Sequence, residues 1–281
     1  MPWDAGGLTL VAAARPLRPT GSAMTLRQSA SFALRSLAVR RGLRRGRPGR
    51  FVFLAAMPKS GSTFLSRALS RALGYEVGYL GYAYSNTEQE LYEPRIVERF
   101  GEGFVVQQHL RASAPNLDLL ARYGIRPVVL TRNVFDVVVS VREHLLSEGL
   151  DRIPSLFVSR AYGALSPAMQ LDTIIRLFCP WLIGFYVSWY QADSIDKIWL
   201  SYDDCVGDWV ACVGRVLDFH GLEVAPPLVA AALDASSGDP RSRINKGVPG
   251  RGAMLLSPAQ QDRIRELTEP FPEVDFAPIG L

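Results

Sequence analysis

The sequence predicts an α/β protein in which helices flank a central parallel β-sheet. Three short apolar runs, each bounded by turn signals, have the length and composition of buried strands. They span residues 51–57, 103–108 and 126–131. Helical patterns separate these runs, and strands that alternate with helices form parallel sheets through right-handed crossovers. Because ligands bind at the carboxyl edge of such sheets, we expect a single domain whose site gathers the residues that follow the strands: Lys59, His109 and Arg132.

The remaining elements follow from helix caps and helix breakers. Gly74 ends the helix after the first strand, Asn133 caps the helix after the third strand, and Ser257 caps the last helix. In order, the sequence predicts helices over 64–73, 116–123 and 134–147, an irregular segment over 148–170, a helix ending at 190, a strand over 197–202, helical structure over 208–235, a polar loop over 236–252 and a helix over 257–268.

The length of 281 residues, with 48% hydrophobic content, predicts one domain with an N-terminal appendage. Residues 1–50 hold ten arginines and one acidic residue, a net charge of about +9, whereas residues 51–281 carry about −5. The net positive charge of the chain comes from the appendage. The sequence therefore does not predict that residues 51–281 bind nucleic acid. We expect a basic, flexible arm over 1–50 and the folded domain over 51–281.

The arm contains a weakly amphipathic helical pattern over residues 24–41. One face of that pattern carries Leu26, Ala30, Ala33, Leu34 and Leu37, with arginines elsewhere. Such a pattern is typical of weak contact between residues 24–50 and an anionic membrane surface, of an organelle transit peptide, or of a solvated arm. The sequence leaves these three open. It predicts a cytoplasmic protein, with membrane association through the arm as the alternative.

The cysteines and the most apolar segment set two further expectations. Cys179, Cys205 and Cys212 are odd in number and have no CxxC spacing, so we expect reduced, mostly buried thiols and neither a disulfide nor a zinc site. Residues 171–190 are interrupted by charged residues and Pro180, which favours a buried helix over a membrane span. No cluster of metal ligands is visible in the sequence.

The first strand leads into Lys59-Ser-Gly-Ser-Thr63, a small polar loop at the start of a helix. The loop brings one cation, three hydroxyls and a glycine to a helix N-terminus, where free N–H groups and the helix dipole favour an anion. A Walker A loop would place its lysine after a second glycine, as GxxxxGK followed by Ser or Thr, whereas Lys59 precedes the loop's single glycine. The sequence therefore predicts a phosphate site of another class.

The segment PKSGSTF around this loop resembles the 5′-phosphosulfate loop of the sulfotransferases that use 3′-phosphoadenosine 5′-phosphosulfate (PAPS). That loop is usually PKSGTTW, so Ser62 and Phe64 are the two departures. The resemblance implies a P-loop-like sulfotransferase architecture. It also implies that the phosphosulfate end of PAPS is bound by Lys59, Ser60, Gly61, Ser62, Thr63 and Phe64.

Two further segments are similar to later motifs of the same family. Arg132-Asn-Val-Phe-Asp-Val-Val-Val-Ser140 resembles the second PAPS motif, which implies that Arg132 and Ser140 hold the 3′-phosphate. The chemistry fits, because a guanidinium fork matches phosphate geometry and a hydroxyl adds a donor. Leu200-Ser-Tyr-Asp-Asp204 is similar to the YED motif, which implies that Tyr202 approaches the adenine.

A fourth segment, Asn245-Lys-Gly-Val-Pro-Gly250, resembles the RKGxxG phosphate loop near the C-terminus of the family. The resemblance implies contacts from Lys246 and Gly247. Asn245 stands where the motif has arginine, and Arg243 or Arg241 could replace that cation.

The use of lysine supports both phosphate loops. The chain has 28 arginines and three lysines, and two of the lysines, Lys59 and Lys246, fall inside the two loops. A compact ammonium can follow a shifting negative charge, which is a physical reason to keep lysine there.

His109 is the candidate general base. It closes Gln107-Gln-His-Leu110, which is similar to the family's KxHL segment at the end of a strand, with Gln107 in place of a lysine. The resemblance implies a catalytic set of His109, Lys59 and Ser140. Other branches of the family use a glutamate as base, so the alternatives are Glu88, Glu90, Glu93 and His144.

The four motifs occur in order over residues 58–250 and imply a PAPS-dependent sulfotransferase. The sulfuryl group would pass to a hydroxyl or amine and leave 3′,5′-adenosine diphosphate (PAP), with no metal required. The acceptor would be a small molecule, a lipid or a glycan, and no nucleic-acid partner is expected. The alternatives are a P-loop kinase or nucleotide hydrolase, and a non-catalytic relative that binds the nucleotide. The sequence does not define the oligomeric state.

Overall fold

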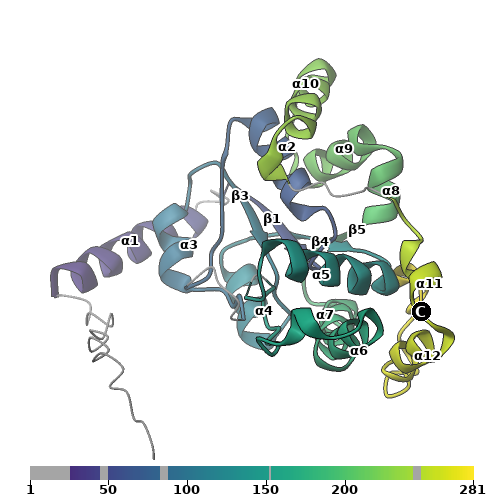
Figure 1. Ribbon diagram of the computed structural model, residues 1–281. Helices are drawn as coiled ribbons and strands as arrows, with labels where there is room; N and C mark the ends of the chain where they lie inside the picture. Colours follow the sequence, from purple (N-terminus) through teal and green to yellow (C-terminus); the bar gives the residue numbers. More distant parts are fainter. Residues whose placement is uncertain (1–25, 45–49, 83–87, 152, 243–247) are drawn as a thin grey trace, which may run out of the picture.

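A computed structural model of the chain describes residues 26–44, 50–82, 88–151, 153–242 and 248–281. Its centre is a five-stranded sheet in which every strand pair is parallel, in the order β2-β3-β1-β4-β5 (Figure 1). The strands are β1 (Phe51–Ala56), β2 (Glu76–Gly78), β3 (Phe104–Gln108), β4 (Pro127–Thr131) and β5 (Ile198–Ser201). The predicted parallel α/β architecture is confirmed.

The register of the three central strands decides where the site lies. β1 lies between β3 and β4, with Ala55 opposite Gln108 and Ala56 opposite Leu130. The three strands therefore end at nearly the same level of the sheet. The residues that follow them emerge together at the carboxyl edge, as expected for a parallel sheet.

The helices of the body cover both faces of this sheet. They are α2 (Ser62–Leu73), α3 (Glu93–Arg99), α4 (Ala114–Arg122), α5 (Val134–Glu148), α6 (Pro167–Leu177), α7 (Cys179–Tyr190), α8 (Tyr202–Gly207), α9 (Trp209–His220), α10 (Pro226–Ser237), α11 (Arg251–Leu255) and α12 (Pro258–Glu266). Short 3₁₀ turns lie at Tyr162–Ala164, Pro240–Ser242 and Ala277–Ile279.

Side chains of β1 alternate between two apolar cores. Phe51, Phe53 and Ala55 join the larger core with α4, α5 and α7, while Val52 and Leu54 join the smaller core with α2, α9 and α10. Figure 1 shows these two groups of helices on opposite sides of the strands. Burial on both faces explains why β1 is a continuous apolar run and not an alternating one.

Two predicted helices are divided in the structure. The helix predicted up to Tyr190 breaks at Phe178 into α6 and α7, because Pro180 lacks the N–H that a continuous helix needs at that position. The helical region predicted over 208–235 is divided by Gly221, which takes a left-handed conformation, and resumes at Pro226.

The segment Pro167–Tyr190 is the one span in the described residues that is long and apolar enough to cross a membrane. Its mean hydropathy is 1.3, and 61% of its apolar window is buried inside the protein. Its second half, α7, supplies Trp181, Phe185 and Trp189 to the larger core. The segment therefore packs as the buried helix that the sequence predicted.

The expectation of three reduced thiols is wrong for one pair. Cys205 and Cys212 form a disulfide, with their Cα atoms 5.3 Å apart, whereas Cys179 is free and buried. The pair forms because α8 ends at Gly207 and α9 begins at Trp209, so a tight turn brings the end of one helix beside the first turn of the next. Cysteine spacing in the sequence gave no sign of this turn.

Helix α1 (Leu26–Arg44) lies within the arm, close to the helix expected over 24–41. It rests against α3, and its Val39 is buried in the larger core. The domain boundary at residue 50 stays a prediction, and the burial of Val39 joins the described part of the arm to the body.

Candidate active site

The phosphate loop is held at the end of β1 by backbone contacts. The Met57 N–H donates to the Leu130 carbonyl across 2.8 Å, and the Ser60 hydroxyl donates to the Met57 carbonyl. Lys59 and Gly61 both have left-handed backbone angles, with φ of 66° and 77°, which turn the chain sharply into α2. Gly61 caps α2 without a side-chain bond to the helix, so the first N–H groups of α2 are left to an anion at this edge.

The loop hydroxyls differ in their exposure. The Ser60 hydroxyl is buried and bonded inward, so it supports the loop and does not face a ligand. Ser62 is buried in the first turn of α2, while Thr63 is half-buried. Of the three predicted hydroxyl donors, Thr63 is therefore the most accessible.

Two aromatic rings pack against the backbone of the loop. A Cβ atom added at Gly61 would lie 2.8 Å from the ring of Tyr202 and 3.2 Å from that of Trp209. The Trp209 ring also lies 4.6 Å from the ring of Phe64, centre to centre, in an edge-on arrangement. Tyr202 and Phe64 were predicted from motifs, whereas Trp209 was missed. Its one signal in the sequence is its place just after the segment Leu200–Asp204.

Arg132 connects the second motif to the phosphate loop. Its Nη1 donates to the Lys59 carbonyl across 2.8 Å, and its guanidinium lies 4.2 Å above the ring of Tyr202. Its Nη2 lies 3.7 Å from the carboxylate of Asp136, and its buried Nε has no hydrogen-bond partner among the described residues. The guanidinium therefore reaches the loop and keeps an unused donor.

Ser140 lies on the same face of α5 as Asp136, one turn further along, because residues four apart are neighbours on a helix. Its side chain is buried. Ser140 thus follows Arg132 and Asp136 at intervals of four residues, and of the predicted Arg132 and Ser140 pair it is Arg132 that contacts the phosphate loop.

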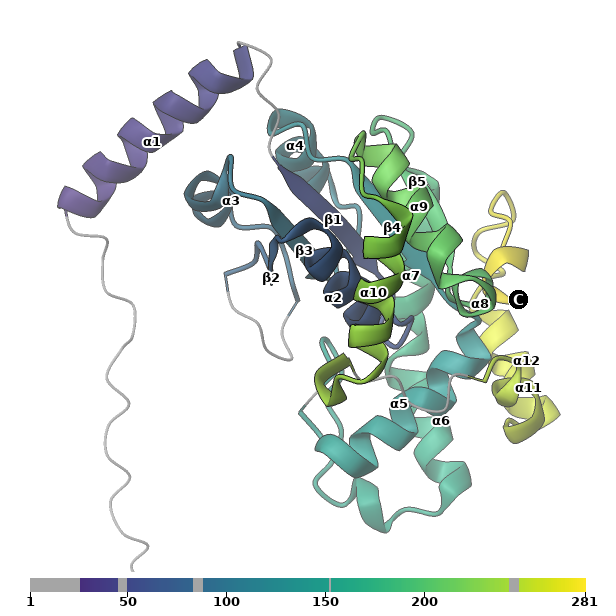
Figure 2. The same ribbon diagram turned by 90° about the horizontal axis from the view of Figure 1, so that it is seen from above.

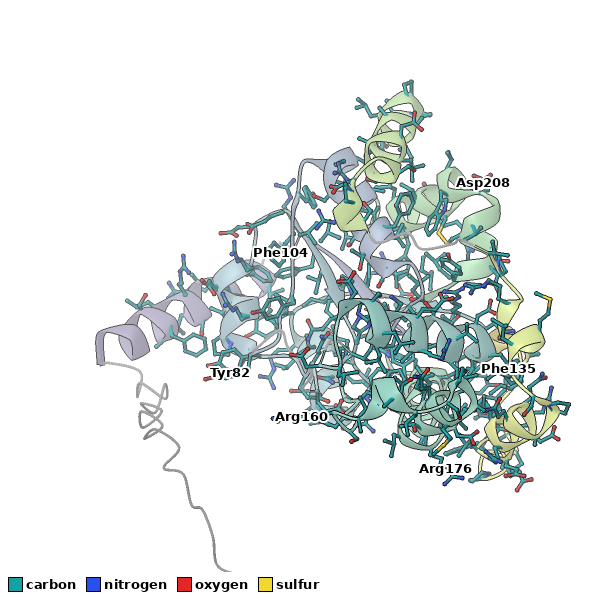
Figure 3. The ribbon with its side chains drawn as sticks, viewed as in Figure 1. Tyr82, Phe104, Phe135, Arg160, Arg176 and Asp208 are labelled. Atoms are coloured by element: carbon teal, nitrogen blue, oxygen red, sulfur yellow. A yellow bond between two sulfur atoms is a disulfide. The ribbon has the colours of Figure 1, made fainter. Side chains whose placement is uncertain are left out.

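Asp136 was not foreseen and fixes the C-terminal segment to the site. Its carboxylate accepts the N–H groups of Gly250 across 2.8 Å and of Gly252 across 2.6 Å. A Cβ atom at Gly252 would lie 2.1 Å from the carbonyl carbon of Phe135, so only glycine allows this approach. Figure 3 shows Phe135 where α5 meets the C-terminal part of the chain.

The predicted contacts of the fourth motif lie outside the described residues. They are Arg243, Asn245, Lys246 and Gly247. Arg241 lies in a described 3₁₀ turn, but its side chain does not belong to the described part of the chain. The end of the motif is described, since Gly250 is bonded to Asp136 beside Arg132.

His109 follows β3 and is bonded on both ring nitrogens. Its Nδ1 lies 2.7 Å from the Ala56 carbonyl, which can only accept, so Nδ1 carries the proton. Its Nε2 lies 3.1 Å from the side-chain nitrogen of Gln107 and accepts from it. The His109 N–H donates to the side-chain oxygen of the buried Gln89 across 2.7 Å. These contacts fix the neutral tautomer whose lone pair is on Nε2.

Burial lowers the pKa of His109 to about 4. The hydrogen bond to Ala56 opposes this shift, and the nearby positive charge of Lys59 adds to it. The imidazole is therefore neutral near pH 7, which is the state that a general base requires.

The alternative bases are engaged elsewhere. Glu88 contacts Arg111 and Trp181, Glu90 accepts from Asn116, and Glu93 accepts from Tyr123 and Arg122. His144 is buried on α5, one turn beyond Ser140. By contrast, His109 bonds directly to Ala56, the last residue of the strand that carries the phosphate loop.

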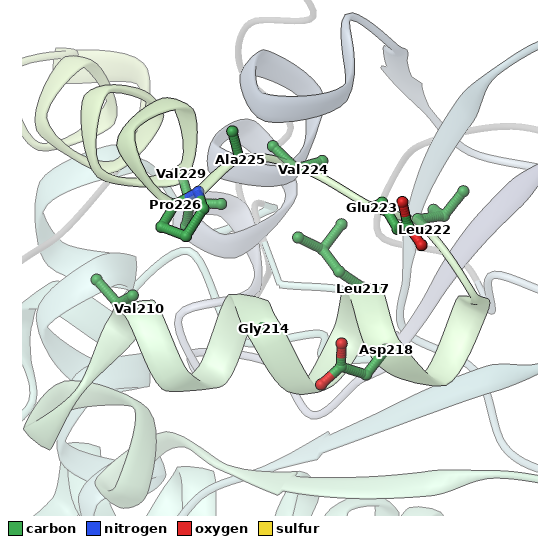
Figure 4. Close-up of a pocket in the computed structure, with 10 residues that line it drawn as sticks. All are labelled: Val210, Gly214, Leu217, Asp218, Leu222, Glu223, Val224, Ala225, Pro226 and Val229. Carbon is green, nitrogen blue, oxygen red and sulfur yellow. The ribbon is translucent and has the colours of Figure 1, made fainter.

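A pocket of about 480 Å³ lies away from this edge, between α9 and the segment that leads into α10 (Figure 4). Its lining is mainly apolar, with the carboxylates of Asp218 and Glu223. Two carboxylates and no cation do not suit a phosphate ligand. The pocket is therefore not the candidate active site.

No family model and no curated protein matches the sequence. Among solved structures, the chain is similar to mouse sulfotransferase SULT7A1 complexed with PAP, with a TM-score of 0.59, 18% identity, and coverage of 80% of this chain and 85% of that one. The chain has the sulfotransferase fold. It is also similar to retinol dehydratase in complex with androsterone and PAP, with a TM-score of 0.54, 16% identity, and coverage of 81% and 82%.

The sulfotransferase fold confirms the architecture that the four motifs implied. A further structure, retinol dehydratase with retinol and PAP, has a TM-score of 0.50 and 16% identity, with coverage of 81% and 83%. At these identities the similarity concerns the fold, and the roles of single residues rest on the geometry above.

Proposed function

We propose that the protein transfers a sulfuryl group from PAPS to a hydroxyl or amine of an acceptor molecule. One observation carries the proposal: Arg132 contacts the phosphate loop at the Lys59 carbonyl, and His109 contacts the end of the strand that carries this loop, at the Ala56 carbonyl. A nucleotide with a 3′-phosphate near Arg132 and a 5′-phosphosulfate on the loop would present its sulfur toward His109. The PAP-bound neighbours support the nucleotide assignment.

The loop and α5 would hold the two ends of PAPS separately. Lys59, Thr63 and the first N–H groups of α2 suit the phosphosulfate, because a cation and a helix N-terminus both favour an anion. Arg132 and Ser140 suit the 3′-phosphate, because a guanidinium and a hydroxyl both donate hydrogen bonds to phosphate oxygens. The aromatic rings of Tyr202 and Trp209, which are inclined at 71° to each other, would offer apolar contacts for the adenine.

The transfer needs one proton acceptor and one site for leaving-group charge. The acceptor hydroxyl would give its proton to Nε2 of His109 while its oxygen forms a bond to sulfur. The bond between sulfur and the 5′-phosphate oxygen breaks, and that oxygen leaves with the electron pair on PAP. The Lys59 ammonium would stabilise the negative charge that develops there. This scheme uses no metal.

The ligands of the similar structures indicate a broad class of acceptor. Retinol dehydratase is held in complex with androsterone and with retinol, which fits a small-molecule acceptor here as well. The proposal includes lipid and glycan acceptors, because the transfer requires only a hydroxyl that reaches Nε2 of His109.

The test combines nucleotide binding with turnover. Calorimetry with PAP, and in parallel with ATP and Mg²⁺, should show binding of PAP alone, because the loop lacks the Walker lysine position. Radiolabelled PAPS with a panel of alcohols, phenols, amines and sugars should then give a labelled product. Binding of ATP with Mg²⁺ in place of PAP would indicate a kinase or hydrolase. PAP binding without transfer to any member of the panel would support a non-catalytic relative.

A further inference from the structure

Helix α1 combines a high positive charge with a complete lack of acidic residues. It contains five arginines, at positions 27, 35, 40, 41 and 44, and no aspartate or glutamate. Residues 51–281, in contrast, carry a net charge of about −5. The positive charge is therefore concentrated on one end of the molecule, where Figures 1 and 2 show α1 as the outermost element.

The two faces of α1 have different roles. Phe32, Val39 and Leu43 are spaced by seven and four residues, so they share one face, and this face packs against the core beside α3. Leu34 and Leu37 lie on the opposite face and are 69% and 53% exposed. The structure uses one apolar face of α1 for the fold and leaves the second in solvent.

The outer face combines exposed leucines with arginines. Ala33 and Ala38 are exposed beside the two leucines, and Arg35 and Arg41 are exposed on the same helix. An outward face of leucine and alanine with flanking arginines is the pattern of a helix that lies in the plane of a membrane interface. Long arginine side chains can reach the headgroups while the aliphatic groups lie deeper.

The charge decides between the possible occupants of this face. A second copy of α1 would bring like charges together, which disfavours pairing. A nucleic acid would use the arginines and give no reason for exposed leucines between them. An anionic bilayer satisfies both groups, since phosphate headgroups attract arginine and the acyl boundary accepts leucine.

We propose that α1 docks the protein onto anionic lipid bilayers, with Leu34 and Leu37 inserted at the boundary of the headgroups and the acyl chains, and with Arg35 and Arg41 on the headgroups. The inference concerns a surface remote from the phosphate loop and does not depend on the proposed transferase activity.

Vesicle flotation of the full chain tests the proposal. The protein should float with vesicles of phosphatidylcholine and phosphatidylglycerol, much less with phosphatidylcholine alone, and less again in high salt. Loss of Arg35 or Arg41, as Arg35→Ala or Arg41→Ala, should weaken binding by about fivefold each, the usual effect of one basic residue near an anionic surface.

The leucines separate docking from plain charge attraction. The double variant Leu34→Gln and Leu37→Gln leaves the charge unchanged and should reduce vesicle binding by about tenfold or more, because two inserted apolar side chains are lost. A matched control, Leu228→Gln with Leu177→Gln, changes leucines that are 59% and 53% exposed on α10 and α6. The control should bind vesicles like the parent, and both variants should keep the parent's unfolding temperature.

Several results would overturn the proposal. Equal binding to neutral and anionic vesicles, or no flotation of the parent chain, would exclude anionic lipid as the partner. Vesicle binding that the arginines control and the leucines do not would reduce the effect to non-specific polyanion attraction. A dimer in sedimentation experiments that the Leu34 and Leu37 variant abolishes would assign the face to self-association.

Discussion

The side-chain nitrogen of Gln107 donates to Nε2 of His109 across 3.1 Å. This is the nitrogen that a general base must present to its substrate, since Nδ1 is bonded to Ala56. In the transfer that we propose, the acceptor hydroxyl would take the position that the Gln107 amide occupies in the free protein. The acceptor would then have to displace this amide before His109 could take its proton.

Replacement of Gln107 by alanine should ease acceptor binding. The acceptor would no longer compete with a neutral hydrogen bond, whose net value is about 1 kcal/mol, so its KM should fall by about fivefold while kcat changes little. Initial rates at saturating PAPS would measure both constants. A large fall in kcat with an unchanged KM would instead show that Gln107 positions the histidine.

Replacement of His109 by asparagine should remove the base and preserve the fold. The asparagine amide can still donate toward the Ala56 carbonyl, whereas alanine would leave a buried acceptor without a partner, at a cost of about 1–3 kcal/mol. Turnover should fall by roughly 10²–10⁴. PAP affinity and the unfolding temperature should stay near those of the parent, and near-parental turnover would exclude His109 as the base.

The pH profile gives a second test of His109. A base acts when it is neutral, and a pKa lowered to about 4 keeps this imidazole neutral in weak acid. The acid limb of kcat/KM should therefore lie near pH 4, well below the ordinary histidine value of about 6.5. Since the unfolded chain binds this proton more readily, the free energy of unfolding should fall as the pH drops from about 6.5 toward 4. An acid limb near pH 6.5 that is lost in His109→Asn would contradict the burial of the base.

Replacement of Lys59 by alanine and replacement of Arg132 by alanine should affect different steps of the reaction. Lys59→Ala should mainly lower kcat, because its charge matters most as the leaving oxygen becomes negative. Arg132→Ala should weaken PAP binding by about tenfold or more, since a charge-assisted bond contributes about 1.5–3 kcal/mol. Calorimetry with PAP and single-turnover rates would separate the effects, with the exposed Arg176→Ala as a control. Unchanged PAP affinity in Arg132→Ala would exclude the proposed 3′-phosphate site.

Gly252→Ala should weaken the site indirectly, through the contacts of α11 with α5 and Asp136. The new methyl group would meet the backbone of Phe135 at 2.1 Å, so α11 must move away from α5 and the bonds to Asp136 must lengthen. We expect a lower unfolding temperature and weaker PAP binding. Gly214→Ala, inside α9 with open space around it, should stabilise the protein by about 0.5–1 kcal/mol. Normal PAP affinity in Gly252→Ala would show that the Asp136 contacts serve stability alone.

The double replacement of Cys205 and Cys212 by alanine should loosen the packing of Tyr202 and Trp209 against the phosphate loop. The disulfide joins α8, which begins with Tyr202, to α9, which begins with Trp209, and both rings pack on Gly61. Loss of this short cross-link should cost about 2 kcal/mol of unfolding free energy and weaken PAP binding. Urea unfolding and calorimetry, with and without dithiothreitol for the parent, would measure both. PAP affinity that is the same in all samples would limit the disulfide to stability.

The sequence predicted those parts of the site that local patterns encode. The buried strands, the polar loop after β1 and the residues that follow β3 and β4 are visible as apolar runs with polar ends, so Lys59, His109 and Arg132 could be placed at one edge. Contacts between distant segments could not be predicted. Asp136 reaches Gly252 across more than a hundred residues of sequence, and so does Trp209 in its packing against Gly61.

The strand order has a consequence for how the chain reaches its folded state. β1 is made first, yet it occupies the centre of the sheet and pairs through Phe51 with Phe104 and through Phe53 with Pro127. The ribosome must therefore deliver β3 and β4, with their crossover helices, before the phosphate loop has a scaffold. Such non-local parallel pairing closes long loops and is intrinsically slow. The apolar strand that carries the loop thus waits unpaired during synthesis, and the yield of soluble protein should depend on chaperones that protect it.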